Sequence, residues 1–302
     1  MTMRVATFAQ SDQMISNALR VQAVMANEQV QESSGLQSED FGGYGSGAGR
    51  VINLQVSVTR AQSYIDASQL ADNKVQVMYS AVGSMTDIIT QLRTQLSAAT
   101  TGSSTATASV INYAQQAMAQ MQGLLNTQYD GEYVFSGART DTAPADLSSF
   151  DTGTGSLTAS DTSYYKGDGE IASVRVSDSQ SISYGVTADN PAFEQVMRLL
   201  KYVGNSRTLS SSDITQALDL ASNALDATST VQAKLSAAAS QIETASTNQS
   251  DYQNFAKTLS TDLTSVDVAA VTAQLSTYQA QLTASYSAIS KIQSMNLASY
   301  LR

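Results

Sequence analysis

The chain has 302 residues and a formal net charge of −10, with two prolines and no cysteine, histidine or tryptophan. The missing cysteines exclude disulfides, thiolate nucleophiles and zinc–sulfur sites, and the missing histidines remove the commonest metal ligand and neutral-pH base. Carboxylates could still bind calcium or magnesium, but no stretch resembles an EF-hand loop. The composition therefore predicts no catalytic site, no metal site and no cofactor.

The negative charge argues against a nucleic acid or an anionic membrane surface as partner. No apolar run approaches the roughly eighteen residues that a membrane helix needs, so no membrane insertion is expected. The first residues, Met1 to Thr7, lack the basic start and apolar core of a secretory signal. We expect a protein that stays in the cell or leaves it by a route that reads no cleaved signal peptide.

A first helix is predicted from about Val5 to Ser33, where apolar residues lie on a loose stripe. It should end at Ser33-Ser34-Gly35, because glycine readily adopts the left-handed conformation that follows many helices. The residues from Ser38 to Gly49 are rich in glycine and predict a flexible or tightly turning connector.

The stretch from Val51 to Leu96 has apolar residues at steps of three and four, which is typical of a coiled-coil seam. These seam residues are Val51, Leu54, Val58, Ala61, Ile65, Val75, Met78, Val82, Met85, Ile89, Leu92 and Leu96. A weak patch with Ser68 and Asp72 near the seam predicts a shift in phase between its two halves. A single helix of this length would extend roughly 70 Å at 1.5 Å per residue, so it must bury its stripe against other helices.

Helix should resume at about Thr105 after a short link, which favours an antiparallel neighbour. The pattern changes after Tyr129, and Tyr133-Val134-Phe135 predicts a strand within sequence rich in Gly, Ser, Thr and Asp. Further strand patterns occur at Ile171, Val174 and Val176, and at Ile182, Tyr184 and Val186. Tyr164 to Gly169 is predicted to be a hairpin turn, and its Gly167-Asp168-Gly169 run is interpreted as a simple turn, not a phosphate or calcium loop.

Helix returns at Asn190-Pro191, a cap residue followed by proline at the first helical position, and should end at Gly204. A last long helix should begin near Ser212 and continue almost to the end of the chain. We therefore predict a mainly α fold, in which long antiparallel helices formed by both chain ends make a coiled-coil bundle with a small inserted β-rich outer module. The predicted domains are the terminal helices 1–50 plus 260–302, a rod-like bundle 51–132 plus 190–259, and a β-rich surface module 133–189.

The chain resembles the bacterial flagellin superfamily over nearly its whole length. Gln29 to Leu36 is similar to the turn that follows the family's first helix, and Leu275 to Leu301 is similar to its C-terminal helix. In the centre, Tyr133-Val134-Phe135-Ser136-Gly137, Thr142-Ala143-Pro144 and Tyr165-Lys166-Gly167-Asp168 are similar to the hook–filament junction protein of this superfamily. The glycine-rich connector Ser38–Gly49 departs from filament flagellins, which have a polar, charged stretch there.

The resemblance implies a subunit exported unfolded through the flagellar type III channel, which polymerises outside the cell with its terminal helices lining the core and its β-module facing outward. The implied partners are further copies of the chain, hook and filament junction proteins, the filament cap, the export apparatus and an export chaperone. The terminal stripes, which we expect to be loose in the monomer, are predicted to form the assembly interface: Phe8, Ile15, Leu19, Met25, Val268, Val271, Leu275, Tyr278, Leu282, Ile289 and Ile292. The turn after the first helix is assigned to Ser33, Ser34, Gly35 and Leu36.

Several functions remain open at this level. We expect a filament-forming subunit with junction-type sequence in its centre, and the alternative is the junction protein itself, forming a ring between hook and filament. A secreted coiled-coil adhesin or effector would also lack a signal, but would not need matching stripes at both ends. An enzyme within the β-module would have to use Asp141, Asp146, Asp161 or Asp168, which lie on turn-like sequence where solvated aspartates are far commoner than catalytic ones.

Overall fold

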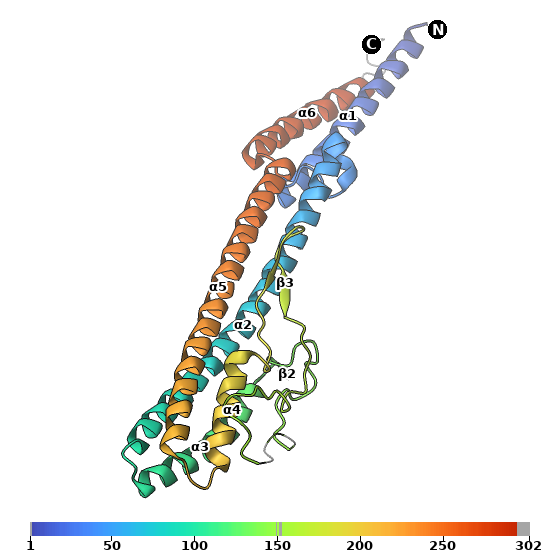
Figure 1. Cartoon of the computed structure of the whole chain (residues 1–302). Coiled ribbons are helices and arrows are strands. Elements are labelled where there is room, and N and C mark those ends of the chain that lie inside the picture. Colours follow the sequence, from blue (N-terminus) through green and yellow to red (C-terminus); the bar gives the residue numbers. More distant parts are fainter. Residues whose placement is uncertain (1, 149, 151–152, 295–302) are drawn as a thin grey trace. The chain divides into compact units, whose positions relative to one another are not determined.

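The computed structural model describes residues 2–148, 150 and 153–294 (Figure 1). Its fold is mainly α, with long antiparallel helices and two small strand pairs, which confirms the predicted fold class. The chain divides into two compact units. The terminal unit comprises Met1–Thr59 and Gln253–Arg302, and the central unit comprises Arg60–Tyr252. The boundaries between them fall within two long helices, α2 (Ala48–Ala99) and α5 (Ser211–Thr264).

The central unit contains most of α2 and α5 together with α3 (Ser104–Leu125) and α4 (Pro191–Asn205). Its core is one apolar cluster to which all four helices contribute. The predicted seam residues from Val75 to Leu96 are all buried there. At the predicted phase shift, Ser68 and Ala71 are both buried, so the seam takes two successive steps of three residues. This is the local change of register that the weak patch indicates.

Local sequence accounts for the helix ends in this unit. Gly102 has φ +75° in the link after α2, and the Ser103 side chain accepts a hydrogen bond from Ala106 N, 3.4 Å away, at the start of α3. The Asn190 side chain accepts from Ala192 N at 3.0 Å, and Pro191 occupies the first turn of α4. The Asn190 cap and the position of Pro191 confirm the predicted start of α4.

The β-rich segment is less regular than predicted. Strands β1 (Gln128–Tyr129) and β2 (Glu132–Tyr133) pair antiparallel, as do β3 (Ser173–Arg175) and β4 (Ser181–Ser183). The predicted strand through Phe135 was wrong beyond Tyr133: Phe135 instead buries its ring 5.7 Å from that of Phe193, edge to face. Burying the aromatic side chain against α4 takes precedence over extending the two-residue ladder.

The hairpin predicted at Tyr164–Gly169 was also wrong. The turn between β3 and β4 lies at 176–180, where Val176 N donates to Gln180 O at 3.0 Å. Tyr165 instead forms an isolated antiparallel bridge with Ala145, and Ile171 lies outside β3 with its side chain exposed. The glycines therefore turn the chain within an irregular segment, not between two paired strands.

The terminal unit holds α1 (Thr2–Ser34), the short 3₁₀ helix η1 (Phe41–Gly47), the first residues of α2, the last residues of α5, and α6 (Val268–Ser294). Helices α1 and α6 pack along each other and run antiparallel (Figure 1). The prediction of one unbroken last helix was wrong, because α5 and α6 are separated at Ser265–Asp267. The Asp267 carboxylate accepts from Ala269 N at 3.0 Å and Ala270 N at 3.2 Å, which caps a new helix.

Candidate assembly interface

Three of the residues predicted to pack between molecules are buried within the chain. Val271, Leu275 and Leu282 of α6 have 7%, 4% and 7% of their surface exposed, and Ala18 of α1 is similarly buried. Met25, Tyr278, Ile289 and Ile292 are partly buried. The expectation that the whole stripe waits for other subunits is therefore corrected for these residues, because α1 and α6 run back along each other and cover each other's apolar face.

Other predicted interface residues remain exposed. Ile15 and Leu19 of α1 are 38% and 60% exposed, and Val268 at the start of α6 is 42% exposed. The side chain of Phe8 lies outside the described residues. At 100° per residue, Ile15 and Leu19 point about 100° away from the row formed by Met14, Ala18 and Met25. Helix α1 thus has two apolar stripes, and α6 of the same chain covers only one of them.

The turn predicted after the first helix lies where the C-terminal end of α1 comes close to the N-terminal end of α6. Gly35 has φ +69°, and its amide donates to Gln31 O at 2.8 Å, which closes α1. Ser34 Oγ donates to Val30 O at 2.7 Å and accepts from Leu36 N at 3.2 Å. Ser33 Oγ also donates to Val30 O, at 3.0 Å.

The same turn pairs with the break between α5 and α6. Leu36 and Ser265 form an antiparallel bridge, in which Gln37 N donates to Thr264 O at 2.7 Å and Val266 N donates to Gly35 O at 3.0 Å. Thr272 Oγ1 donates to Glu32 Oε1 at 2.9 Å one turn further along. The Ser33–Leu36 turn therefore fixes the register of α1 against α6.

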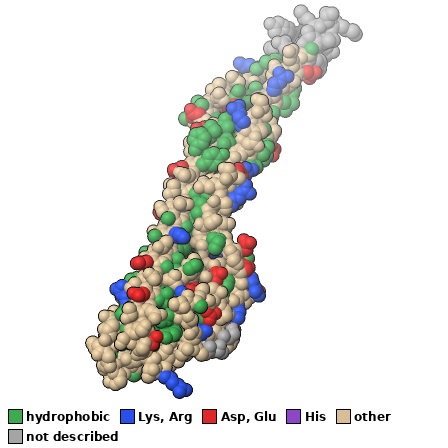
Figure 2. Space-filling view, viewed as in Figure 1, with side chains coloured by type: hydrophobic (Ala, Val, Ile, Leu, Met, Phe, Trp, Pro, Cys, Tyr) green, Lys and Arg blue, Asp and Glu red, His purple; other side chains and the backbone are tan. Residues whose placement is uncertain are grey.

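Exposed apolar side chains are concentrated in the terminal unit. Among the described residues, twelve of the sixteen exposed large hydrophobic side chains belong to it. Figure 2 shows green hydrophobic groups set in a surface that is mostly uncharged. Burying these apolar groups between subunits would be favourable, because it removes them from water. The terminal unit is therefore the best candidate for an assembly surface.

In the central unit, the two segments with junction-type sequence pack against each other. Asp168 Oδ1 accepts from Ala138 N at 2.8 Å, and Asp168 N donates to Ser136 O at 3.1 Å. Gly137 has φ +74°, and a Cβ placed there would lie 2.2 Å from Asp168 Oδ1. Arg139 Nη1 donates to Lys166 O at 3.0 Å. We refer to these contacts between 136–139 and 166–168 as the module contact.

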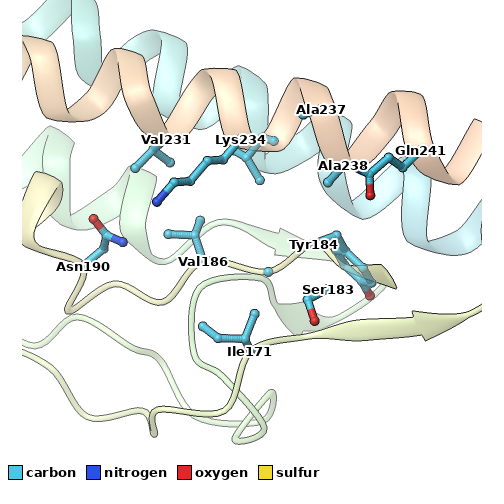
Figure 3. Close-up of a pocket in the computed structure, with 12 residues that line it drawn as sticks. Ile171, Ser183, Tyr184, Val186, Asn190, Val231, Lys234, Ala237, Ala238 and Gln241 are labelled. Atoms are coloured by element: carbon cyan, nitrogen blue, oxygen red, sulfur yellow. The ribbon is translucent and has the colours of Figure 1, made fainter. Parts of the chain in front are cut away.

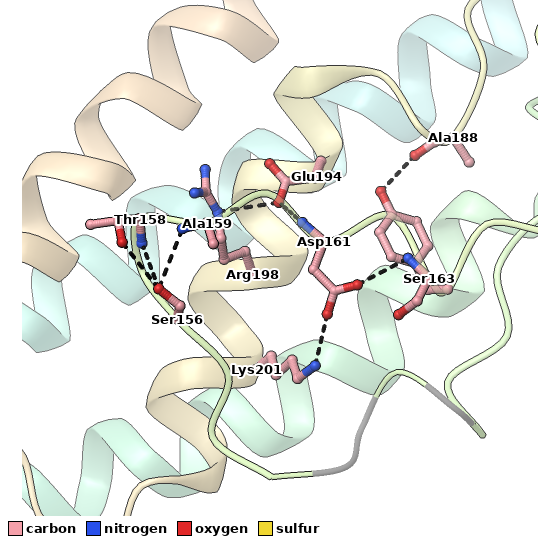
Figure 4. Close-up of polar contacts among 10 residues, drawn as sticks. Ser156, Thr158, Ala159, Asp161, Ser163, Ala188, Glu194, Arg198 and Lys201 are labelled. Atoms are coloured by element: carbon pink, nitrogen blue, oxygen red, sulfur yellow. Dashed lines mark hydrogen bonds and ion pairs between the residues drawn. The ribbon is translucent and has the colours of Figure 1, made fainter.

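A second set of polar contacts attaches the loop around Asp161 to α4 (Figure 4). Lys201 Nζ lies 2.8 Å from Asp161 Oδ2 and 4.4 Å from the centre of the Phe150 ring. Asp161 N donates to Glu194 Oε1 at 2.9 Å, and Arg198 Nε lies 3.2 Å from the same oxygen. Burial raises the pKa of Asp161, but hydrogen bonds from Lys201 and Ser163 outweigh it and leave that pKa below its usual value.

The aspartates considered as catalytic candidates all have local structural partners. Asp146 accepts from Ser148 N at 2.9 Å and Ser148 Oγ at 2.8 Å, which lowers its pKa. Asp141 accepts from Thr142 Oγ1 at 3.0 Å. Asp161 pairs with Lys201, and Asp168 accepts a hydrogen bond from Ala138 N, as described above. Burial, together with nearby carboxylates, raises the pKa of Tyr164 and Tyr165.

One groove in the central unit lies between the end of the β3–β4 hairpin and α5, with a volume of ≈ 410 Å³ (Figure 3). Its floor is apolar, with Val186, Val231 and Leu235, and Lys234 is the one charged residue in its lining. A single ammonium without a carboxylate partner in the lining does not form an acid–base pair. Among the described residues, no cluster of acidic side chains could hold a metal ion, and no helix is suited to crossing a membrane.

The comparisons with known proteins agree with this arrangement. The model of the bacterial flagellin N-terminal helical region matches residues 5–140, and that of the C-terminal helical region matches residues 218–301. None of the curated proteins compared with the chain matches it.

One solved structure of a flagellar protein shares the fold, and two others match less closely. A flagellar hook-associated protein from Vibrio parahaemolyticus superposes with a TM-score of 0.60 at 15% identity, covering 75% of this chain and 99% of that one. FlgL from Bacillus cereus, with a TM-score of 0.49 at 16% identity, covers 70% and 98%, and flagellar hook-associated protein 3 from Legionella pneumophila, with 0.45 at 15%, covers 71% and 97%.

Proposed function

We propose that this chain, which belongs to the bacterial flagellin superfamily, is a hook-associated subunit that joins the flagellar hook to the filament. The chain is a structural component of the bacterial flagellum, and its family assembles into flagellar polymers.

The module contact carries the preference for the junction. The sequences 133–137 and 165–168, which resemble the junction protein, are separated in the chain, yet they are held together through Asp168. Both sequence segments are needed for the module contact. Gly137 leaves room for the Asp168 carboxylate, and the carbonyl oxygen of Ser136 accepts a hydrogen bond from the backbone amide of Asp168. The flagellar hook-associated protein from Vibrio parahaemolyticus, which has the same fold, also supports this placement.

A filament subunit, which the sequence pattern favours, is the second candidate. The observation that supports it is the match of both chain ends to the flagellin helical regions, since those regions are shared by filament subunits. Both candidates use the same assembly surface in the terminal unit. They differ in copy number and position.

Immunogold labelling of isolated flagella tests the choice. The junction proposal predicts a single labelled band where the hook meets the filament. Continuous label along the filament would overturn it in favour of the filament subunit. Label that is absent from flagella of a producing strain would contradict both candidates.

Polymerisation through the terminal helices is tested by truncation. Deleting Met1–Ser33 or Val268–Arg302 should abolish seeded polymerisation, because each deletion removes one of two mutually covering helices, while α2 to α5 stay helical by circular dichroism. Normal polymers from either truncation, collected by sedimentation, would refute the role of the terminal helices.

We further propose that residues 141–189 face outward, and that the subunit is exported unfolded with the help of an export chaperone and meets hook, filament and cap proteins outside the cell. Protease treatment of intact polymers should then cut residues 141–189 before the terminal helices. Cleavage in the termini with residues 141–189 spared would reverse the orientation.

A further inference from the structure

Two pairs of exposed apolar side chains lie on the parts of α2 and α5 that belong to the terminal unit. Ile52 and Val56 of α2 are 42% and 49% exposed, and Phe255 and Leu259 of α5 are 65% and 38% exposed. Each pair is spaced i and i+4, so its members are neighbours on one helix face. We call them the α2 strip and the α5 strip.

The described part of the chain leaves both strips exposed. In this part of the terminal unit α5 faces α2 through Gln253 and Ala256, which are 6% and 0% exposed, and Gln253 Nε2 donates to Val58 O at 3.3 Å. The facing row of α2 contains Val51, which is 1% exposed. At 100° per residue, the α5 strip lies about 110° from its helix's packed face, and the α2 strip lies about 150° from the packed row of α2.

These offsets place the strips on different sides of the helix pair. Since the two helix segments run antiparallel, the rotations add, and the strips point about 140° apart. A subunit in a helical polymer needs two different surfaces of this kind, because a head-to-tail contact joins one patch to an unlike patch on the next copy.

We propose that the α2 strip of one copy packs on the α5 strip of the next copy, as a contact additional to that of the terminal helices. The inference rests on the proposed self-assembly and names one of its interfaces. Register and charge agree with an antiparallel pairing of the strips. Val56 then opposes Phe255, Ile52 opposes Leu259, and Arg50 lies at the same end of the contact as Asp262. Both charged side chains are exposed, and opposite charges there offset part of the repulsion between copies of an acidic chain.

Engineered cysteines provide a specific test, because the chain has none of its own. Val56→Cys and Phe255→Cys are introduced into separate chains, which are polymerised together and oxidised. The proposal predicts covalent dimers in the mixture and none in polymers of either variant alone, since the contact joins unlike surfaces. Asn53→Cys mixed with Thr258→Cys is the matched control, with exposed polar positions outside the strips, and should give few cross-links.

Polymers from the Val56→Cys and Phe255→Cys mixture that form without cross-links would overturn the proposal. Equal cross-linking in a single variant would also overturn it, because each strip would then contact the same strip on another copy. In both cases polymerisation itself persists, so the proposed self-assembly would stand.

A charge substitution gives an independent measurement. Phe255→Glu should raise the critical concentration for polymerisation roughly tenfold or more with unchanged helix content, whereas Thr258→Glu on the same exposed helix should change it little. Equal critical concentrations for the two variants would contradict the α5 strip's role.

Discussion

A leucine-to-alanine substitution distinguishes the exposed apolar stripe of α1 from the buried contact between α1 and α6 when it is made once in each. Leu19 of α1 is 60% exposed, whereas Leu275 of α6 is 4% exposed against α1. Leu19→Ala should leave the stability of the monomer nearly unchanged and weaken assembly. Leu275→Ala should destabilise the terminal helix pair within each monomer.

The size of the assembly effect follows from the exposed surface. Leucine has three more carbons than alanine, worth about 0.8 kcal/mol each when buried, or about 2.4 kcal/mol in all. The exposed 60% of Leu19 would contribute about 1.4 kcal/mol on burial between subunits, which is about tenfold in the critical concentration. For Leu275→Ala, loss of packing and the resulting cavity should cost about 2–5 kcal/mol within the monomer.

Sedimentation over a range of subunit concentrations measures the critical concentration, and amide hydrogen exchange in α1 and α6 of the monomer measures the stability of the helix pair. The reasoning would be refuted if Leu19→Ala polymerised at the wild-type concentration. It would also fail if Leu19→Ala unfolded the helix pair as readily as Leu275→Ala, because Leu19 would then be packed inside the monomer.

Three further outcomes are expected in the central unit. Gly137→Ala should lower the free energy of unfolding by more than Gly131→Ala, because both glycines have positive φ but only at Gly137 would the new Cβ collide with Asp168; urea unfolding of the two variants decides this. Asp161→Asn should destabilise the unit by roughly 1–3 kcal/mol at pH 7, because it leaves the Lys201 ammonium, only 9% exposed, without its carboxylate. The pKa of Asp161 is lower in the folded chain than in the unfolded chain, so its contribution is present above about pH 4 and is lost as the pH falls through the folded value; unfolding measured between pH 7 and pH 2 should show a smaller acid-induced loss in Asp161→Asn than in the wild type.

The sequence was most informative where one periodicity extends over many turns. The seam from Val75 to Leu96 repeats often enough to specify a helix and its buried face, and the structure buries every one of its residues. Asn190-Pro191 likewise specifies its helix start, since capping is local chemistry.

The sequence was least informative where a distant contact replaces a local preference. Ser265 looks like one more polar residue in a long helix, yet its pairing with Leu36 ends α5 there. Phe135 continues a strand pattern, but its ring packs on Phe193, which is remote in the chain. Neither partner is recognisable from residues nearby.

The candidate interface shows both effects. The apolar stripe of α6 was recognised, but periodicity does not say whether another subunit or α1 of the same chain covers Val271 and Leu275. The sequence does not single out the α5 strip, because Phe255 lies among polar residues of a long helix. Its i, i+4 partner Leu259 was the available signal.

Amide hydrogen exchange of the subunit, measured first as a dilute monomer and then after polymerisation, tests the central claim most directly. A pair of helices with one stripe in water is marginal alone, so the amides of α1 should exchange much faster than those of α2 around Met85 in the monomer and become protected in the polymer. Protection of α1 in the monomer equal to that of the central core, unchanged by polymerisation, would contradict the claim that assembly completes the terminal unit.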